Sequence, residues 1–379
     1  MPWREVSTVS LRHEFVLLAN REGANVRALC RRMGIAPNTA YKWLGRYRTE
    51  GLSGLQDRSR RPHSCPQHTS PAIECAVVAM RNAHPAWGAR KIRARLLATG
   101  WIDLPAPSTL TAILKRHGCL DPQETPAHRA WQRFEHAQPN SLWQMDFKGH
   151  FAMMRGRCHP LTVLDDCSRF AIGLYACANE QSETVQTRLT AIFRRYGLPE
   201  SILMDNGAPW GSDAAHPYTP LTAWLIRLGI RVSHARPYHP QTQGKDERFH
   251  RTLVAEVLRY QSFRDLAHCQ ARFDQWRDVY NLERPHQALA MAVPASRYQP
   301  SARSFPDTLP PIEYGPGDIV RKVQAQGLIS YQNRTFHLSK AFRALPVALR
   351  PTTKDGLLEV FFCHQRIGHI DLHQRKDYN

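Results

Sequence analysis

The sequence predicts a multidomain protein with an all-α amino-terminal region, a central α/β domain built on a mixed sheet, and a small β-barrel at the carboxy terminus. Three observations predict this order. Apolar residues recur at helical spacing up to about residue 120, strands alternate with helices from residue 141, and short strands separated by turn residues follow Pro300. At 379 residues the chain is long enough for two or three domains.

The composition excludes several classes of protein. The 51 Lys and Arg exceed the 32 Asp and Glu by 19, and the pI of about 9.9 predicts affinity for polyanions such as nucleic acid. No apolar run approaches the ~18–20 residues of a membrane span, and the first residues lack the apolar stretch of a signal peptide. The nine cysteines include no Cys-x-x-Cys pair, so we expect a reduced cytoplasmic protein without membrane partners.

Residues 1–55 are predicted to form a helix-turn-helix domain. Asn25 is a suitable cap for a helix that Gly34 ends, and Pro37 occupies the first position of a second helix, 37–50. The first 62 residues hold 12 Lys and Arg against 5 Asp and Glu, which favours a DNA-binding domain over a plain helical packing module. The residues of the second helix that we expect to contact DNA are Thr39, Tyr41, Lys42 and Arg46.

Residues 56–71 form a predicted basic linker rich in Gly, Ser, Pro and Arg. Its arginines Arg58, Arg60 and Arg61 are candidates for phosphate or minor-groove contacts, as in other basic arms, although a solvated tether fits the composition equally well.

Residues 72–120 are predicted to be a second helix-turn-helix-like domain with helices at 73–83, from about 88 to 97, and at 109–117. Pro107 and Ser108 are expected to cap the third helix, and Gly118 to end it. Arg90 and Lys91, at the start of the second helix, are further candidates for DNA contacts. Residues 121–140 are predicted to be a polar connector with a short helix around Trp131 and Phe134.

Residues 141–300 carry the α/β pattern, and residues 301–379 carry the predicted barrel. In the first region the strands are expected at 142–153, 161–164, 170–176, 201–204 and 230–233, and the helices at 183–196, 221–228, 245–260 and 266–280. In the second region the six strands are expected at 319–323, 328–331, 334–338, 347–350, 357–362 and 366–372.

Three acids of the α/β domain lie where chemistry is expected. Asp146 interrupts the first strand, Asp205 directly follows a short apolar strand, and Glu247 lies in the first turn of a long helix. Converging carboxylates repel one another unless a cation lies between them, and Mg²⁺ prefers such oxygen ligands. Taken singly, each acid is more simply explained as a cap, a turn residue or a solvated side chain.

The residues around the three acids favour a shared chemical role over separate structural ones. Trp143-Gln-Met-Asp146-Phe, Asp205-Asn-Gly and the run from His239 to Arg251 resemble the catalytic blocks of the retroviral-integrase superfamily. Within it the chain looks most like bacterial insertion-sequence transposases made from one reading frame. The segment from Tyr280 to Leu289, with Arg284-Pro-His286, matches the segment that follows that core. The resemblance covers about residues 25–300.

The resemblance implies an RNase H-like integrase core in which Asp146, Asp205 and Glu247 are the DDE triad and hold Mg²⁺ or Mn²⁺, as two ions. Activated water would cleave one strand at a transposon end, and the freed 3′-OH would attack target DNA directly. The 41 residues between Asp205 and Glu247 exceed the usual spacing, and the Pro-rich stretch 208–220 is expected to hold the surplus as a loop.

Several neighbours of the acids have two interpretations. Asp165 and Asp166 are rival carboxylates, but an Asp-Asp-Cys-Ser sequence is typical of a hairpin turn. Trp210 suits base stacking or simple packing. Basic residues beside the third acid are candidates for phosphate contacts, and Arg251, four residues after Glu247, is also placed for a salt bridge to it. These candidates for DNA contacts are Lys245, Arg248 and Arg251.

The leading prediction is therefore a DNA transposase that binds the terminal inverted repeats of a transposon and catalyses metal-dependent 3′-end cleavage and strand transfer. Its expected partners are double-stranded DNA and other copies of itself, in the bacterial cytoplasm at the nucleoid. One alternative is a non-catalytic DNA-binding regulator derived from a transposase, against which an intact triad argues. Another is a structure-selective nuclease, which would have no need of repeat-reading helix-turn-helix domains.

Overall fold

The computed structural model describes residues 7–59, 69–120, 135–211, 217–234 and 244–373. The chain divides into two compact units, 1–68 and 69–379, and each is considered by itself. The short helix expected around Trp131 and Phe134 lies outside the described residues.

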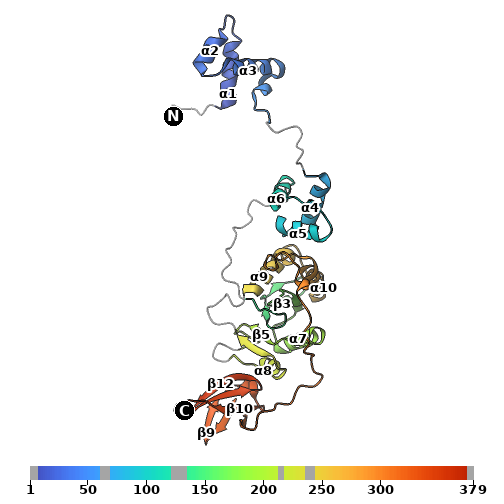
Figure 1. Ribbon diagram of the computed structural model, residues 1–379, viewed down its shortest axis with the longest axis vertical. Coiled ribbons are helices and arrows are strands. Elements are labelled where there is room, and N and C mark those ends of the chain that lie inside the picture. Colours follow the sequence, from blue (N-terminus) through green and yellow to red (C-terminus); the bar gives the residue numbers. More distant parts are fainter. Residues whose placement is uncertain (1–6, 60–68, 121–134, 212–216, 235–243, 374–379) are drawn as a thin grey trace. The chain divides into compact units, whose positions relative to one another are not determined.

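The first unit is a three-helix domain (Figure 1). Its elements are α1 Thr8–Ala19, α2 Val26–Met33, α3 Pro37–Glu50 and the 3₁₀ turn η1 Gly51–Leu55. Asn25 caps α2 by accepting a hydrogen bond from the Ala28 N–H at 3.1 Å, and Gly34 ends that helix in the left-handed region at φ 64°. The predicted limits of α2 and α3 are therefore confirmed. The sequence analysis missed α1, which supplies Phe15 and Val16 to the core.

A second helical group opens the other unit. It comprises α4 Pro71–Ala83, α5 Ala89–Ala98 and α6 Pro107–Arg116, packed around Trp87, Ile92 and Leu110. Arg81 is buried in this group, where its guanidinium donates to the carbonyl oxygens of Trp87 and Cys119. All three helices lie close to where they were expected, although α4 begins two residues earlier, at Pro71, and α6 begins at Pro107 and not after it.

The central domain is a mixed sheet with helices on both faces (Figure 1). Its strands are β1 Trp143–Phe147, β2 Phe151–Ala152, β3 Arg157–Asp165, β4 Ala171–Cys177, β5 Ser201–Met204 and β6 Arg231–His234. Its helices are α7 Ser182–Tyr196, α8 Pro220–Arg227, α9 Gly244–Leu253 and α10 Leu266–Asp278, with the π-helical turns η3 Val254–Leu258 and η4 Val279–Glu283 after the last two. The expected first strand is thus two strands, β1 and β2.

The strand order is β4-β3-β1-β5-β6, with the short β2 paired to the start of β3. Pairing is antiparallel from β4 to β1 and parallel from β1 through β5 to β6. Side chains alternate between the faces, so Trp143 and Met145 of β1 pack with α7 and α8, while Leu164 and Leu174 pack with α9 and α10. Gln144 and Asp146 consequently lie on the face that α9 covers.

Side-chain amides cap both edges of this sheet. Asn281 exchanges two hydrogen bonds with the peptide of Ala171 on β4, at 2.8 and 3.0 Å. Gln365 does the same with Val232 on β6, at 2.8 and 2.9 Å. Because an unpaired strand edge invites pairing with another chain, these amides protect the sheet.

The predicted carboxy-terminal barrel is not confirmed. The six expected strands are all present: β7 Ile319–Lys322, β8 Leu328–Tyr331, β9 Arg334–His337, β10 Pro346–Pro351, β11 Leu357–Phe362 and β12 Gln365–Asp371. They form an open sheet of order β12-β11-β10-β7 and a separate β8-β9 hairpin. These strands bury their apolar side chains without closing into a barrel, because the side chains join the core of the central sheet. One such contact is between Tyr218 and Phe342, whose ring centres lie 5.3 Å apart.

Among the described residues, no helix is long and apolar enough to cross a membrane. The eight cysteines in that part of the chain are free thiols.

Candidate active site

Two aspartates meet where neighbouring parallel strands end. Trp143 and Gln144 of β1 pair with Ile202 and Leu203 of β5, and continuing this register by two residues sets Asp146 opposite Asp205. Asp205 directly follows the fully buried strand β5. The geometry therefore brings together two of the three carboxylates that the sequence selected.

Asp205 is held at both its side chain and its main chain. The Gly207 N–H donates to its Oδ1 at 3.1 Å, and the His234 Nδ1–H of β6 donates to its carbonyl oxygen at 2.8 Å. A Cβ at position 207 would lie 3.1 Å from Oδ2 of Asp205, tighter than ordinary contact, so glycine lets the loop turn closely around the carboxylate. The second carboxylate is thus held in place without being neutralised.

Burial disfavours the charge of both carboxylates, and Asp205 further disfavours that of Asp146. Burial, followed by the nearby charge of Asp205, raises the pKa of Asp146 to about 7. Burial also raises the pKa of Asp205. Neither forms an ion pair with a lysine or arginine of the described residues. A pair of this kind is a favourable place for a cation, because a positive charge between the carboxylates removes their repulsion.

Glu247 does not join this pair. Its side chain is 65% exposed on the first turn of α9, and it accepts a hydrogen bond from Arg251 at 2.9 Å. The salt-bridge interpretation of Arg251 is therefore the one observed. Within the described part of the chain, no three His, Cys, Asp or Glu side chains lie close enough together to hold a metal ion.

Asp246, the neighbour of Glu247, is the carboxylate of α9 that points inward. It is fully buried, and neither carboxylate oxygen has a hydrogen-bond partner among the residues that the structure describes. Burial, then the charges of Asp146 and Asp166, raises its pKa well above the ordinary value. The sequence analysis missed it. Its signal is helical spacing, because Asp246, Phe249 and Leu253 lie at i, i+3 and i+7 on the buried face.

A threonine and a histidine beside Asp146 were also missed. The Thr162 hydroxyl of β3 donates to the Asp146 carbonyl oxygen at 2.9 Å and lies 2.8 Å from Nε2 of His250 on α9. The other ring nitrogen, Nδ1, lies 4.0 Å from Oδ2 of Asp146. Burial, helped by Lys148, lowers the pKa of His250 to about 4. A polar residue inside the apolar run Leu161-Thr-Val-Leu was the available signal for Thr162.

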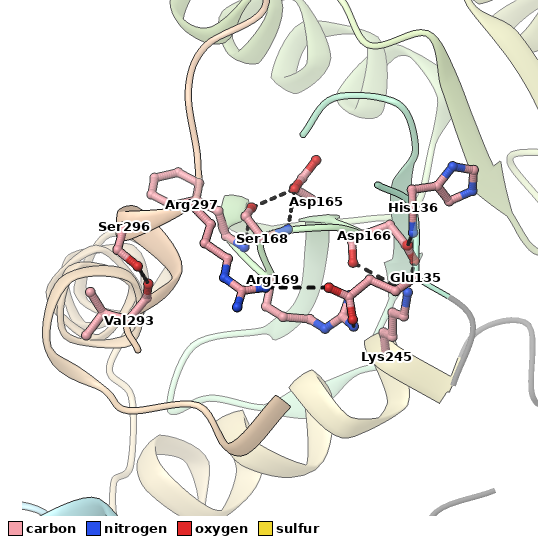
Figure 2. A network of polar contacts seen from close by, with 11 residues as sticks. Glu135, His136, Asp165, Asp166, Ser168, Arg169, Lys245, Val293, Ser296 and Arg297 are labelled. Carbon is pink, nitrogen blue, oxygen red and sulfur yellow. Dashed lines mark hydrogen bonds and ion pairs between the residues drawn. The ribbon is translucent and has the colours of Figure 1, made fainter. Parts of the chain in front are cut away.

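The rival aspartates form a hydrogen-bonded turn between β3 and β4 (Figure 2). Asp165 accepts hydrogen bonds from the Asn140 N–H, the Ser168 N–H and the Ser168 hydroxyl, at 2.7, 2.7 and 2.6 Å. Asp166 accepts from Gln144 Nε2 and the His136 N–H and forms an ion pair with Lys245. The turn interpretation of both residues is therefore the one observed.

The residues predicted to contact DNA differ in how far their side chains are exposed. Thr39, Tyr41 and Lys42 are exposed on α3, and Arg46 is half-buried, with its guanidinium carbon 5.0 Å from the centre of the Trp43 ring. Arg58 pairs with Glu50.

Arg60 and Arg61 lie outside the described residues. Arg90 and Arg248 are exposed. Lys91 is largely buried, and this burial, together with the charge of Arg284, lowers its pKa to about 8.

Lys245 and Trp210 are engaged inside the protein. Lys245 is 19% exposed and bound to Asp166. Trp210 is 1% exposed and stacks on Phe147 with ring centres 5.8 Å apart, so the packing interpretation of this residue is the one observed.

Comparison with known protein families matches almost every part of the chain. An integrase core domain model matches residues 136–240, and a second integrase core model matches 228–294. The model of the IS481 family transposase C-terminal domain matches residues 318–378. A helix-turn-helix domain model matches 12–63, and a homeodomain-like model matches 39–114. In this order of domains the chain is similar to insertion-sequence transposases with an integrase core.

Curated relatives include proteins of two insertion elements. The uncharacterized 31.7 kDa protein of IS407 from Burkholderia multivorans is 28% identical over 157 residues, which cover 41% of this chain and 54% of that one. The uncharacterized 39.2 kDa protein of IS476 from Xanthomonas euvesicatoria is 25% identical over 258 residues, covering 64% and 69% of the two chains. The match thus spans about half of the first relative and about two thirds of the second.

Solved structures with partial likeness are viral integrases. A chain of the simian T-cell lymphotropic virus intasome in complex with the PP2A regulatory subunit B56 gamma is 16% identical, with a TM-score of 0.37, over 78% of this chain and 98% of that one. The HTLV-2 integrase catalytic core domain in complex with magnesium is 15% identical, with a TM-score of 0.31, over 42% and 97%.

Proposed function

We propose that this transposase binds the terminal inverted repeats of its own element, cleaves the 3′ ends and joins them to target DNA in metal-dependent reactions. The observation that carries the proposal is the pair Asp146 and Asp205, two carboxylates at adjacent strand ends that have no lysine or arginine partner among the described residues, and the charge of Asp205 disfavours that of Asp146. Such a pair stabilises a bound cation far more than it stabilises the fold.

The donor atoms fit Mg²⁺ or Mn²⁺, because they are carboxylate oxygens and the adjacent buried carboxylate of Asp246 has no partner. Asp146 and Asp205 would hold the metal, with Glu247 as the third ligand that the sequence indicates. When bound, two such ions supply an activated water and stabilise the charge that develops on the leaving oxygen.

The chain's own residues account for orientation at this site. Gly207 and His234 fix Asp205, and Thr162 fixes the main chain at Asp146. Hydrolysis of one strand leaves a 3′-OH, and attack of that 3′-OH on a target phosphodiester exchanges one ester bond for another. No covalent protein intermediate is required.

DNA recognition is assigned to α3, where Thr39, Tyr41 and Lys42 are exposed together. Arginines and lysines on phosphates would make binding fall steeply with salt, in keeping with the net charge of +19. Joining two ends further requires more than one copy of the chain on the DNA.

Strand transfer by the purified protein in Mg²⁺ tests the proposal, with a labelled duplex that carries the terminal repeat taken from the flanking DNA of the element. We expect joined product from the wild type and none from Glu247→Gln, with binding of the end retained. Glu183→Gln is the matched control, because Glu183 is likewise an exposed glutamate in the first turn of a helix.

Two results would contradict the proposal in different ways. Binding of the repeat without cleavage or joining by the wild type, in both Mg²⁺ and Mn²⁺, would identify a non-catalytic regulator. Full activity of Glu247→Gln would leave the transposase in place but remove Glu247 from its triad.

A further inference from the structure

We propose that His250, acting through Thr162, is a positioning residue that sets the Asp146 carboxylate relative to helix α9. The inference rests on the proposed metal site at Asp146. It assigns to α9 a second role, besides carrying Glu247, that the three-acid motif does not include.

The first element of the argument is the pairing of β1 with β3. Asp146 and Thr162 are directly opposite each other in this antiparallel ladder. Thr162 is fully buried, and its hydroxyl donates to the Asp146 carbonyl oxygen at 2.9 Å. The hydroxyl therefore holds the main chain at the residue that carries the carboxylate.

The second element is the imidazole of His250. Its Nε2 lies 2.8 Å from the Thr162 hydroxyl oxygen, and its Nδ1 lies 4.0 Å from Oδ2 of Asp146. The ring is 13% exposed. It therefore spans the space between strand β3 and the carboxylate of β1, and any rotation of α9 moves it against both groups.

The third element is the geometry of α9. His250 follows Glu247 by three residues, which on an α-helix corresponds to about 60° around the axis and about 4.5 Å along it. The neighbours Phe249 and Leu253 are buried against the core, but apolar contacts alone permit a helix to slide or rotate slightly. The polar contact of His250 removes that freedom, so it fixes the distance between Glu247 and Asp146.

Groups that orient a ligand in this way act on metal affinity, typically by about 10–100-fold. A merely structural role would lower the stability of the metal-free protein and leave its affinity for metal unchanged. The two roles are therefore separated by a binding measurement made without DNA.

The test uses the full chain and Mn²⁺ alone, and it measures the Mn²⁺ concentration that gives half of the metal-dependent rise in Tm. We expect Thr162→Val, which keeps the shape and removes the hydroxyl, to need at least about tenfold more Mn²⁺. We expect the same of His250→Ala, and no further loss when the two are combined, because both changes break one chain of contacts.

Two control variants complete the set. Thr162→Ser restores the hydroxyl and should return the affinity to within about threefold of the wild type, which also keeps the test valid if Thr162→Val folds poorly. Thr190→Val removes another hydroxyl that donates to a main-chain carbonyl, at 2.8 Å on α7, and should have no effect on Mn²⁺ affinity.

The outcomes separate this inference from the proposed function. A metal-dependent rise in Tm that is lost in Asp146→Asn but unchanged in Thr162→Val and His250→Ala overturns the positioning role alone. A rise that persists in Asp146→Asn, or no rise in the wild type, overturns the metal site at Asp146 and the inference with it.

Discussion

Two pairs of aspartates lie on the same sheet and have opposite surroundings. Asp165 and Asp166 are buried in the turn between β3 and β4, where main-chain N–H groups, Ser168, Gln144 and Lys245 bind their oxygens. Asp146 and Asp205 have no lysine or arginine partner among the described residues. Burial raises the pKa of both, as it does that of Asp165.

The comparison indicates which property of a pair of acids points to a cation site. Both pairs bring two negative charges together, so proximity alone does not distinguish them. Donors of the fold surround the turn pair, whereas the strand-end pair receives fewer such contacts, as expected of the cation site that we propose there. Five predictions, in order of decreasing effect, test this distinction and its limits.

The largest effect is expected from Asp146→Asn or Asp205→Asn. Each removes a charge that a metal needs, so strand transfer should fall about a thousandfold or more, which corresponds to about 4 kcal/mol of transition-state stabilisation. Thermal unfolding without metal should show an unchanged or higher Tm, because repulsion is relieved. A loss of unfolding free energy as large as that expected for Asp165→Ala in the turn would mean that the two pairs do not differ in this way.

Asp165→Ala should have the opposite pattern. Three donors on Asn140 and Ser168 lose their acceptor inside the protein, which should cost about 3 kcal/mol of unfolding free energy in denaturant titrations. Asp278→Ala, at an exposed aspartate of α10, is the control and should change little.

Lys245→Met tests whether this lysine stabilises the turn or contacts DNA. Asp166 would stay buried without its cation, so we expect a loss of about 2 kcal/mol of unfolding free energy. Its effect on the salt dependence of DNA binding should be negligible, because the ammonium faces Asp166. A decrease of about one in the slope of log DNA affinity against log salt concentration (the salt slope) would instead support the contact of Lys245 with DNA that was predicted from the sequence.

His286 offers a buried polar group outside both pairs. It is 8% exposed, its Nε2 has no partner, and burial together with Arg284 lowers its pKa to about 2. A histidine whose pKa is lowered in the fold stabilises the protein above its unfolded pKa of about 6.5 and loses that contribution as pH falls toward 2.

The wild type should therefore lose about 1.4 kcal/mol of unfolding free energy per pH unit below about 6.5, relative to His286→Gln. Parallel pH profiles of the two proteins would show that His286 is solvated in solution. In that case, a buried polar group without a hydrogen-bond partner would be weaker evidence for a functional site than the comparison of the two aspartate pairs suggests.

The smallest effect is expected from Arg251→Gln. Its pair with Glu247 is exposed on both sides, so unfolding free energy should change by less than about 0.5 kcal/mol. If Arg251 leaves Glu247 for a phosphate when DNA binds, the salt slope of DNA binding should fall by about one. A stability loss above 1 kcal/mol would mean that the pair is structural.

Much of the fold follows from local pattern. Asn25, Gly34 and Pro37 fix the limits of α2 and α3 because capping and φ are properties of neighbouring residues. The same holds for β5, whose predicted limits are those observed. Helix α1 was missed because its apolar residues do not form a clear stripe, and the barrel was wrong because strand spacing does not tell whether the edge strands meet.

From the sequence alone come the candidate carboxylates, the proposed class of chemistry and the helix caps of the first domain, because these depend on residue types at short spacing. Only the tertiary structure decided which carboxylates meet. The parallel register of β1 and β5 sets Asp146 opposite Asp205, and the rotation of α9 turns Asp246 inward and Glu247 outward. The spacing of Asp246, Phe249 and Leu253 indicates which face of α9 is buried, but not which strand that face meets. Strand register and the partner of that face are set by packing between segments about 60 to 100 residues apart in the chain, and no local pattern encodes them.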